Sequence, residues 1–313
     1  MDRGGMKIVL AGGSGALGRR IAADLTAAGH EVVVLTRSPR ESGAYRQVGW
    51  DGVTVGPWAT ELAGAVLINL AGAIVDRRPT ASAVELLTRS RVEPTRALAE
   101  AATAALPAVW VQMSTLAIYG DGGERIIDET AAPAEGPPQM AGVARAWEAA
   151  AEDAPAGRQV ILRTAVVLDR DTPALDRLAG LTRWGLGGRI GTGRQWVSWL
   201  HIADLLAIIR RCLSDPEMTG VVHATSPNPV RNADLMAALR RTMRRPAAPP
   251  TPAALVRVGS LLLRTDPALA LTGRRCVPTR LRDAGFAFAY PDLPHALEDL
   301  LTRRTPSRST AAD

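Results

Sequence analysis

A glycine-rich segment near the start of the chain constrains the fold most. Gly12, Gly15 and Gly18 follow the apolar run 7–10, which predicts a short buried strand, and they open the helix-like stretch 18–28. In a turn of this kind the first glycine allows a tight bend, the second lets backbone amides approach a pyrophosphate, and the third lets the helix pack against the strand. The phosphates would lie at the partly positive N-terminus of that helix. The order of strand, glycines and helix therefore predicts a dinucleotide site.

The segments that follow alternate between strand-like and helix-like patterns up to about residue 170. The run 31–35 is continuous and β-branched, as strands of a parallel sheet are when both their faces are buried. Further strands are expected at 65–70, 109–114 and 160–168, and helices at 84–105 and 142–151. This alternation predicts an α/β fold, a doubly wound parallel sheet of the Rossmann type with helices on both faces.

The pattern changes after residue 170. The glycine-rich stretch Trp184–Gln195 predicts a long loop, and the proline cluster Pro246–Pro252 marks a linker. Short polar ends of chains are commonly disordered. We therefore expect a nucleotide-binding Rossmann domain over 6–170 with 200–230 packing back onto it, a smaller substrate-side domain with a C-terminal extension over 171–301, and a disordered tail over 302–313.

Composition argues against several functional classes. The net charge of +6 comes from arginines that are scattered along the chain, so nucleic-acid binding is not expected. The longest uncharged apolar stretch, Leu62–Val75, is broken by glycines and is too short to span a bilayer. Cys212 and Cys276 cannot form a disulfide framework, and no Cys/His cluster has the spacing of metal ligands. We expect a cytoplasmic monomer or homodimer that acts on a small molecule and holds no metal.

The end of the second expected strand distinguishes between two cofactors. An acidic residue there would accept hydrogen bonds from the adenosine ribose of NAD(H) and repel a 2′-phosphate. This chain has Thr36, Arg37 and Ser38 instead, and Arg19 adds a second cation. A guanidinium and hydroxyls suit a 2′-phosphate, which favours NADP(H); the alternative is that Arg37 is only a solvated surface charge.

The predicted cofactor site thus joins three segments of the chain. Its members are Gly12, Gly13, Ser14, Gly15, Ala16, Leu17, Gly18 and Arg19 in the turn, Thr36, Arg37 and Ser38 after the second strand, and Asn69, Leu70, Ala71 and Gly72 after the next.

Longer motifs resemble a known family. The segments 69–72 and 114–120 resemble those of the extended short-chain dehydrogenase/reductases, whose nucleotide-sugar epimerases carry a similar run of hydroxyl residues ending in Tyr-Gly. The remaining matches resemble an atypical, epimerase-like branch with a characteristic C-terminal extension, and they lie at 90–95, 185–188, 191–195, 198–205, 278–281 and 285–291. The resemblance covers 6–301 and implies a nicotinamide-binding fold, a preference for NADP and a poorly known substrate.

One feature of the wider family is missing. Its members use a tyrosine and a lysine four residues later to transfer a proton. When the segment is counted back from Glu148, these positions fall on Met140 and Ala144, and Lys7 is the only lysine in the sequence. The atypical branch resembles this chain in lacking the pair. Without a lysine, the pKa of a tyrosine stays near that of a free phenol, about 10, unless the charge of the cofactor lowers it.

Three residues remain as catalytic candidates. Ser114 and Thr115 end an expected strand at the carboxyl edge of the sheet, where ligands of such folds bind, and either could hydrogen-bond a substrate carbonyl. Which of them takes the place of the family serine depends on a one-residue shift in the alignment. Tyr119 is the only tyrosine near the expected cleft, and its alternative role is that of a packed aromatic side chain.

Four further residues are candidates for the substrate pocket. Gln195 and Trp199 belong to a loop region that would form a lid or wall for a flat or sugar-like ligand, although tryptophans also simply pack. His201, with Asp204 three residues on, is either an acid–base couple or a packing and capping element. Arg163 would face an anionic substrate or form a salt bridge beneath the loop.

Two functional hypotheses follow. The first is an NADP(H)-dependent oxidoreductase, or a redox-neutral epimerase, acting on an unidentified and sugar-like small molecule. The second is a non-catalytic NADPH-binding sensor or regulatory protein, in which Met140 and Ala144 reflect lost chemistry.

Overall fold

The structure of the protein is a computed structural model that describes residues 5–40, 45–75, 77–136, 138–170, 172–263 and 266–302. Of the tail expected over 302–313, Thr302 ends helix α10 (Leu293–Thr302), and the rest lies outside the described residues.

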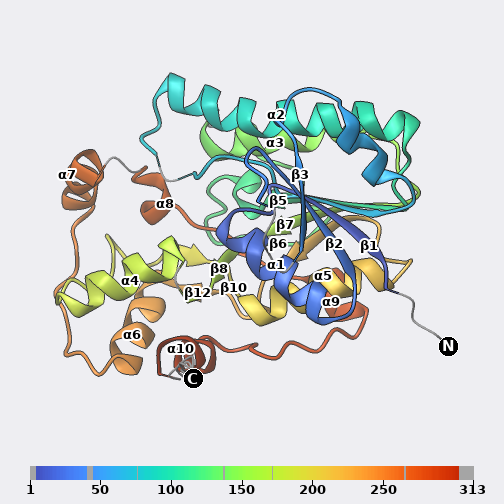
Figure 1. Ribbon diagram of the computed structural model, residues 1–313. Coiled ribbons are helices and arrows are strands. Elements are labelled where there is room, and N and C mark those ends of the chain that lie inside the picture. The colour runs from blue at the N-terminus through green and yellow to red at the C-terminus, as the bar shows by residue number, and fades with distance from the viewer. Residues whose placement is uncertain are drawn as a thin grey trace, which may run out of the picture.

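Seven parallel strands form the central sheet, in the order β11-β7-β5-β4-β1-β2-β3 (Figure 1). They are β1 (Lys7–Ala11), β2 (Glu31–Thr36), β3 (Arg46–Gly49), β4 (Val66–Asn69), β5 (Val109–Thr115), β7 (Gln159–Thr164) and β11 (Gly220–Ala224). The chain builds outward from β1 first toward β3 and then, through β4, toward β11. Ligands of such sheets bind beyond the carboxyl ends of the strands where the order reverses, here between β1 and β4.

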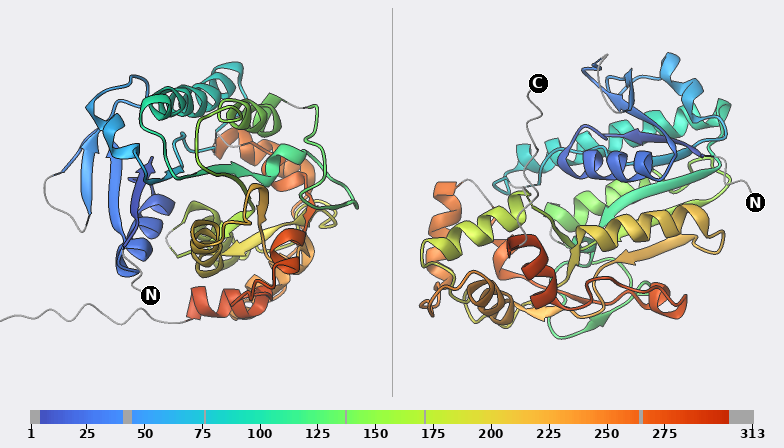
Figure 2. Two further views of the ribbon diagram at one scale, coloured as in Figure 1. Left: turned by 90° about the vertical axis from the view of Figure 1, so that its right-hand side faces the viewer. Right: turned by 60° about the horizontal axis from the view of Figure 1, so that its bottom comes forward.

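Helices cover both faces of this sheet, as a doubly wound fold requires (Figure 2). Ile8 and Leu10 of β1 pack in one core with α1 (Ala16–Ala27) and α5 (Ile202–Ser214). Val9, which points to the other face, packs with α2 (Ala81–Ala104). The predicted fold class is confirmed.

The expected strand over 160–168 is in fact two strands. β7 ends at Thr164, where its neighbours in the sheet end too, so the chain beyond has no partner there. It continues as β8 (Val166–Leu168), which pairs with β10 (Trp199–His201) in a separate sheet. Strand β3 is not indicated by the sequence, because its polar residues lie at the edge of the sheet.

The remaining elements are short or belong to the second half of the chain. They are η1 (Pro57–Leu62), η2 (Leu116–Tyr119), β6 (Ile126–Ile127), η3 (Pro138–Gly142), α3 (Val143–Ala149), α4 (Pro173–Arg183), β9 (Trp196–Val197), β12 (Val230–Arg231), α6 (Asn232–Thr242), α7 (Ala253–Leu263), α8 (Ala268–Leu271), β13 (Arg275–Cys276) and α9 (Thr279–Asp283).

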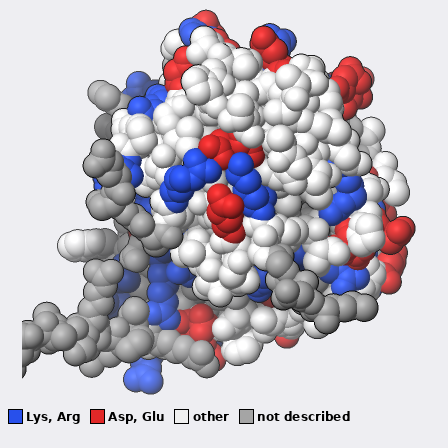
Figure 3. All heavy atoms as spheres, turned by 45° about the vertical axis from the view of Figure 1, so that its right-hand side comes forward, with Lys and Arg blue, Asp and Glu red and all other residues white. Residues whose placement is uncertain are grey.

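Charged side chains and helix hydropathy describe the surface and the helices further. On the face in Figure 3, basic and acidic side chains lie next to one another near the centre and at the right edge. None of the helices within the described ranges is both long enough and apolar enough to cross a bilayer.

Candidate functional site

The glycine turn is built as the predicted dinucleotide site requires. Gly12 has a φ of +79°, and a Cβ there would lie 2.9 Å from the backbone of Ala71. A Cβ on Gly18 would lie 2.5 Å from Cα of Gly13, so the turn and α1 can only touch through a glycine. A Cβ on Gly15 would have no neighbouring atom nearer than 3.7 Å. Gly15 is the N-cap of α1, and the first turn of this helix carries no acidic residue. The first and third glycines thus close the turn, and the second leaves room for an anion at the helix N-terminus.

The end of β2 is basic and open. Thr36 is half-buried, and Arg37 and Ser38 are exposed. No residue in the described part of the chain forms a hydrogen bond or ion pair with the Arg37 side chain. Arg19, also exposed, donates from Nη1 to the carbonyl of Ser14 in the glycine turn. The Arg37 guanidinium and the remaining N–H groups of Arg19 can therefore meet an anion from the solvent side.

Asn69 differs from the predicted role as a cofactor ligand. Its side chain is fully buried, and its Nδ2 donates to Thr95 Oγ1 at 2.8 Å and to Gln112 Oε1 at 3.0 Å. Its Oδ1 accepts from the backbone of Ala71 at 3.1 Å. Because these contacts use both ends of the amide, the Asn69 side chain holds the loop 70–72 in place.

A buried ion pair fixes Ser114. Arg163 donates from Nε and Nη2 to the two carboxylate oxygens of Glu148, at 2.9 and 2.8 Å. Ser114 donates from Oγ to the same carboxylate at 2.5 Å. Since the serine hydroxyl has one proton and donates it in the hydrogen bond to Glu148, Ser114 cannot also donate a hydrogen bond to a substrate carbonyl. Arg163 thus forms the salt bridge named as the alternative to a contact with an anionic substrate.

Tyr119 is also held within the protein. Its ring is buried, and its hydroxyl accepts from Arg163 Nη1 at 2.6 Å. Because a carbonyl oxygen can only accept, His223 Nδ1 donates to the carbonyl of Val277. In a neutral imidazole Nε2 is then the acceptor, so the Tyr119 hydroxyl donates a hydrogen bond to His223 Nε2, 2.7 Å away. Burial raises the pKa of Tyr119 to about 12, against the opposing effect of Arg163, and burial lowers the pKa of His223 to about 4. These contacts give Tyr119 a packing role and argue against the predicted catalytic one.

The remaining pocket candidates pack within the second half of the chain. Trp199 is fully buried and donates from Nε1 to Asn228. His201 caps α5 by accepting from the backbone of Ala203, and its ring stacks on Tyr290 with 3.8 Å between centroids. Burial lowers the pKa of His201 to about 4. These contacts give both residues the packing and capping roles that were named as alternatives.

Gln195 fastens the glycine-rich loop. Its Nε2 donates to the carbonyls of Ile190 and Ala270, at 3.1 and 2.8 Å. The amide thus ties this loop to α8, so Gln195 shapes the loop and does not present a free amide to a ligand.

Thr115 is the candidate whose proton remains free. Its Oγ1 accepts from the backbone of Ala117 at 3.1 Å and caps η2, and its own proton has no partner within the described residues. It ends β5 at the carboxyl edge of the sheet, one strand beyond β4. The positions of the missing pair lie on the neighbouring helical segment, where Ala144 is buried and Met140 has a φ of +57°.

Three charged residues of this region were missed by the sequence reasoning. In the sequence, Glu148 was only the reference from which positions 140 and 144 were counted, although its carboxylate accepts a hydrogen bond from Ser114. Arg91 and Arg274 are guanidinium groups inside the fold, and Arg274 donates from Nε to the carbonyl of Gly120. The one available signal was position: Arg91 lies between Leu87 and Thr95 on the buried face of α2, where a cation is unusual.

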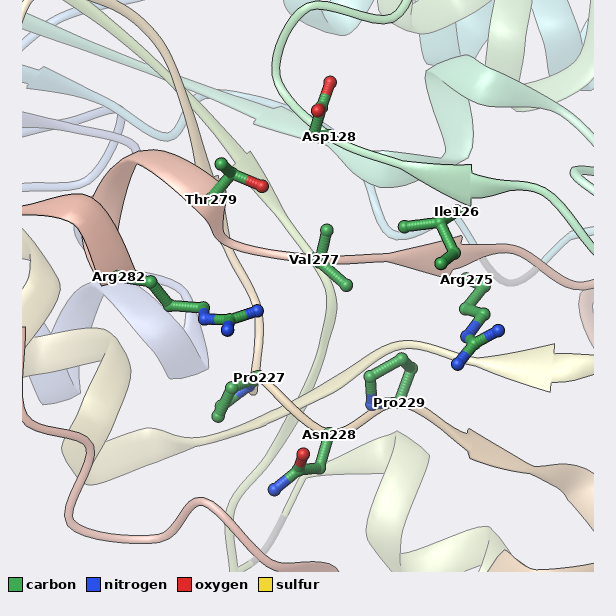
Figure 4. A pocket seen from close by; sticks show the side chains of 9 residues that line it. All are labelled: Ile126, Asp128, Pro227, Asn228, Pro229, Arg275, Val277, Thr279 and Arg282. Atoms are coloured by element: carbon green, nitrogen blue, oxygen red, sulfur yellow. The ribbon is translucent and has the colours of Figure 1, made fainter.

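A hollow of about 440 Å³ lies elsewhere, beyond the carboxyl end of β11. Arg275 and Arg282 point into it from opposite sides, and Asp128 and Asn228 belong to its wall (Figure 4). It is separated from the glycine turn by the width of β4, β5 and β7, about 19 Å at the usual strand spacing. None of the predicted site residues lines it. Within the described ranges, no group of three or more His, Cys, Asp or Glu residues could hold a metal ion.

Comparison with known proteins places this geometry in a family. Residues 8–141 match the NAD dependent epimerase/dehydratase family, and residues 251–300 match a domain of unknown function, DUF1731. The epimerase family protein SDR39U1 of Bos taurus is 31% identical over 305 residues, which cover 95% of this chain and all of that protein.

Solved structures show the same likeness. The human epimerase family protein SDR39U1, crystallised with NADPH, is 29% identical with a TM-score of 0.82, over 94% of this chain and 99% of that one. A structure described as the nucleoside-diphosphate sugar epimerase from Corynebacterium glutamicum is 31% identical with a TM-score of 0.75, over 95% of this chain and 58% of that one. The chain therefore belongs to the epimerase family, together with the SDR39U1 proteins.

Proposed function

We propose that the protein binds NADP(H) and uses it in an oxidoreductase or epimerase reaction on a small, sugar-like molecule. The observation that carries the proposal is the glycine turn, open at Gly15, next to a β2 end that bears Arg37 and no acid. The NADPH in the human SDR39U1 structure and the name of the Corynebacterium glutamicum protein support the cofactor and the sugar-like substrate.

The dinucleotide would lie across the carboxyl edge of the sheet. Arg37, Ser38 and Arg19 would receive the 2′-phosphate, and the amides at Gly15 and the start of α1 the pyrophosphate. The bound nicotinamide would supply or accept a hydride. Thr115 would donate a hydrogen bond to the substrate oxygen, and Ser114, fixed by Glu148, would accept a hydrogen bond from a substrate hydroxyl.

A second candidate function is a non-catalytic NADPH-binding sensor. It is favoured by the apolar Met140 and Ala144 and by the contacts that direct the Tyr119 proton to His223. In that case the nucleotide would bind in the same way, and no substrate would be turned over.

Arg37→Ala should weaken NADPH binding by about tenfold or more and leave NADH binding nearly unchanged. A hydrogen bond to a charged group contributes about 1.5–3 kcal/mol, and only NADPH carries the 2′-phosphate. Thermal melting with NADPH, NADP+, NADH and NAD+ measures this, since a ligand at a hundred times its Kd adds roughly 2.7 kcal/mol. Arg96→Ala, an exposed arginine on α2, is the control. An equal loss for NADPH and NADH would remove the 2′-phosphate assignment, and no shift of the wild type with any nucleotide would contradict the proposed function.

Thr115→Val should abolish the turnover of any substrate found by following NADPH absorbance, while the Kd for NADPH stays within about twofold. Valine has the shape of threonine but no hydroxyl that could donate a hydrogen bond to the substrate oxygen. Thr115→Ser, which keeps the hydroxyl, should retain most of the activity. Full activity of Thr115→Val would disprove the role of this hydroxyl. If the wild type itself shows no turnover in a broad substrate screen, the sensor is favoured.

A further inference from the structure

Arg91 is a buried cation next to the loop that follows β4. Only 8% of the residue is exposed. From α2 its Nη1 donates to the carbonyl of Leu87 at 3.0 Å, and its Nη2 donates to the carbonyl of Ala73 at 3.1 Å. Its Cζ lies 5.1 Å from the ring centre of Trp147 on α3. The guanidinium therefore sits between the loop after β4 and the helix that carries the expected catalytic positions.

This cation lacks a counter-charge among the described residues. Burial alone lowers the pKa of Arg91, to about 10, and no neighbouring carboxylate opposes that effect. The side chain thus stays protonated at neutral pH. A guanidinium has five N–H donors, of which the two backbone carbonyls take two. Because a buried charge is costly unless it is paired, an oxyanion at the remaining donors would be strongly favoured.

Gly72 lies directly against this guanidinium at the surface of the protein. The glycine is exposed, and a Cβ on it would lie 3.0 Å from Arg91 Cζ and 3.2 Å from Nη2. Its φ lies outside the left-handed region, so the backbone conformation does not demand a glycine. The absence of a side chain here matters because any side chain would cover the guanidinium.

The platform that holds Arg91 is rigid. Trp147 donates from Nε1 to Thr95 Oγ1 at 3.1 Å, and Thr95 donates to the carbonyl of Arg91 at 2.7 Å. Asn69 donates to the same Thr95 hydroxyl. A binding group held by such a network keeps its geometry without a ligand, which favours binding.

The place of Arg91 indicates which molecule would supply the anion. In the proposed function, both phosphate sites lie at the ends of β1 and β2, whereas Arg91 lies under the loop after β4, on the other side of β1. The half of the dinucleotide that would reach this side, the nicotinamide riboside, carries no anion. The anion would therefore belong to the substrate.

We propose that Arg91, which is covered at the surface by a glycine without a side chain, Gly72, binds a carboxylate or phosphate group of the substrate next to the nicotinamide. This inference rests on the proposed function for the direction of the dinucleotide. It narrows the substrate class to anionic small molecules, such as a sugar acid or a sugar phosphate.

Inorganic phosphate and acetate serve as probes, because no substrate is needed to detect the site. Each is titrated into the full-length protein at constant ionic strength set with chloride, without NADPH and with saturating NADPH, and thermal melting and nicotinamide fluorescence are recorded. We expect at least one probe to give a saturable response in the wild type that is tenfold or more weaker in Arg91→Gln. The Kd for NADPH should stay within about twofold. Arg89→Gln, an exposed arginine of the same helix, is the matched control.

Gly72→Ala provides a second test that keeps the charge. The added methyl group would press on the guanidinium and cover it, so the anion response should fall even though Arg91 is present. This variant decides the question if Arg91→Gln does not fold.

Three results would overturn the inference: no response of the wild type beyond that of chloride, an undiminished response in both variants, or a tenfold loss of NADPH affinity in Arg91→Gln, which would make Arg91 a cofactor ligand. Absence of NADPH binding by the wild type would instead contradict the proposed function, while the titration without NADPH would still report on Arg91.

Discussion

Replacing Glu148 with alanine should lower the free energy of unfolding by about 3–5 kcal/mol. The carboxylate accepts two hydrogen bonds from Arg163 and one from Ser114, and both ionic partners are almost fully buried. Its removal leaves the Arg163 guanidinium with only the Tyr119 hydroxyl among its described contacts. Urea unfolding at neutral pH measures the loss, and Glu152→Ala, an exposed glutamate that follows the same helix, should change stability by less than about 0.5 kcal/mol.

A double variant separates the cost of an unpaired charge from the cost of lost packing. Glu148→Leu with Arg163→Met removes both charges and should recover a large part of the stability that Glu148→Ala loses, because a buried pair is often replaceable by apolar residues. A loss below about 1 kcal/mol in Glu148→Ala would show that the ion pair does not organise this region.

Gly18→Ala should cost about 2–3 kcal/mol of stability or more, and Gly15→Ala should cost almost none. The methyl group at position 18 would lie 2.5 Å from Cα and 2.6 Å from the carbonyl oxygen of Gly13, and backbone cannot move aside as a flexible side chain can. At position 15 the φ is −70° and the nearest atom is 3.7 Å away, so alanine fits and can even add some tenths of a kcal/mol.

In nucleotide binding the order of the two glycine variants should be reversed. Gly15→Ala, which is stable, should lose NADPH binding, whereas the folded molecules of Gly18→Ala should keep it. The methyl group of Gly15→Ala would occupy the space left for the pyrophosphate, so NADPH should no longer raise the melting temperature although the variant melts like the wild type. Urea unfolding combined with melting in NADPH distinguishes the two effects. Undiminished stabilisation of Gly15→Ala by NADPH would show that the pyrophosphate lies elsewhere.

Sequence alone determined the class of fold and the position of its glycine turn. Strand β1, the turn and α1 are adjacent in the chain, so their apolar runs and glycines report directly on a structure that is itself local. The β-branched run of β2 likewise shows that both faces of this strand are buried. Edge strand β3 gave no such signal, since none of its side chains is fully buried and it therefore needs no apolar pattern.

Only the tertiary structure decided which polar side chains meet. Ser114 and Glu148 are 34 residues apart, and Tyr119 and His223 are 104 apart. Whether such groups pair depends on the order of the strands, which brings β5, β7 and β11 side by side. That order placed Arg163 and Tyr119 in a buried network, left the proton of Thr115 free, and set the Arg91 guanidinium under Gly72. A pattern of residue types records burial, but a hydrogen bond depends on the positions of two atoms, and the register of distant strands sets those positions.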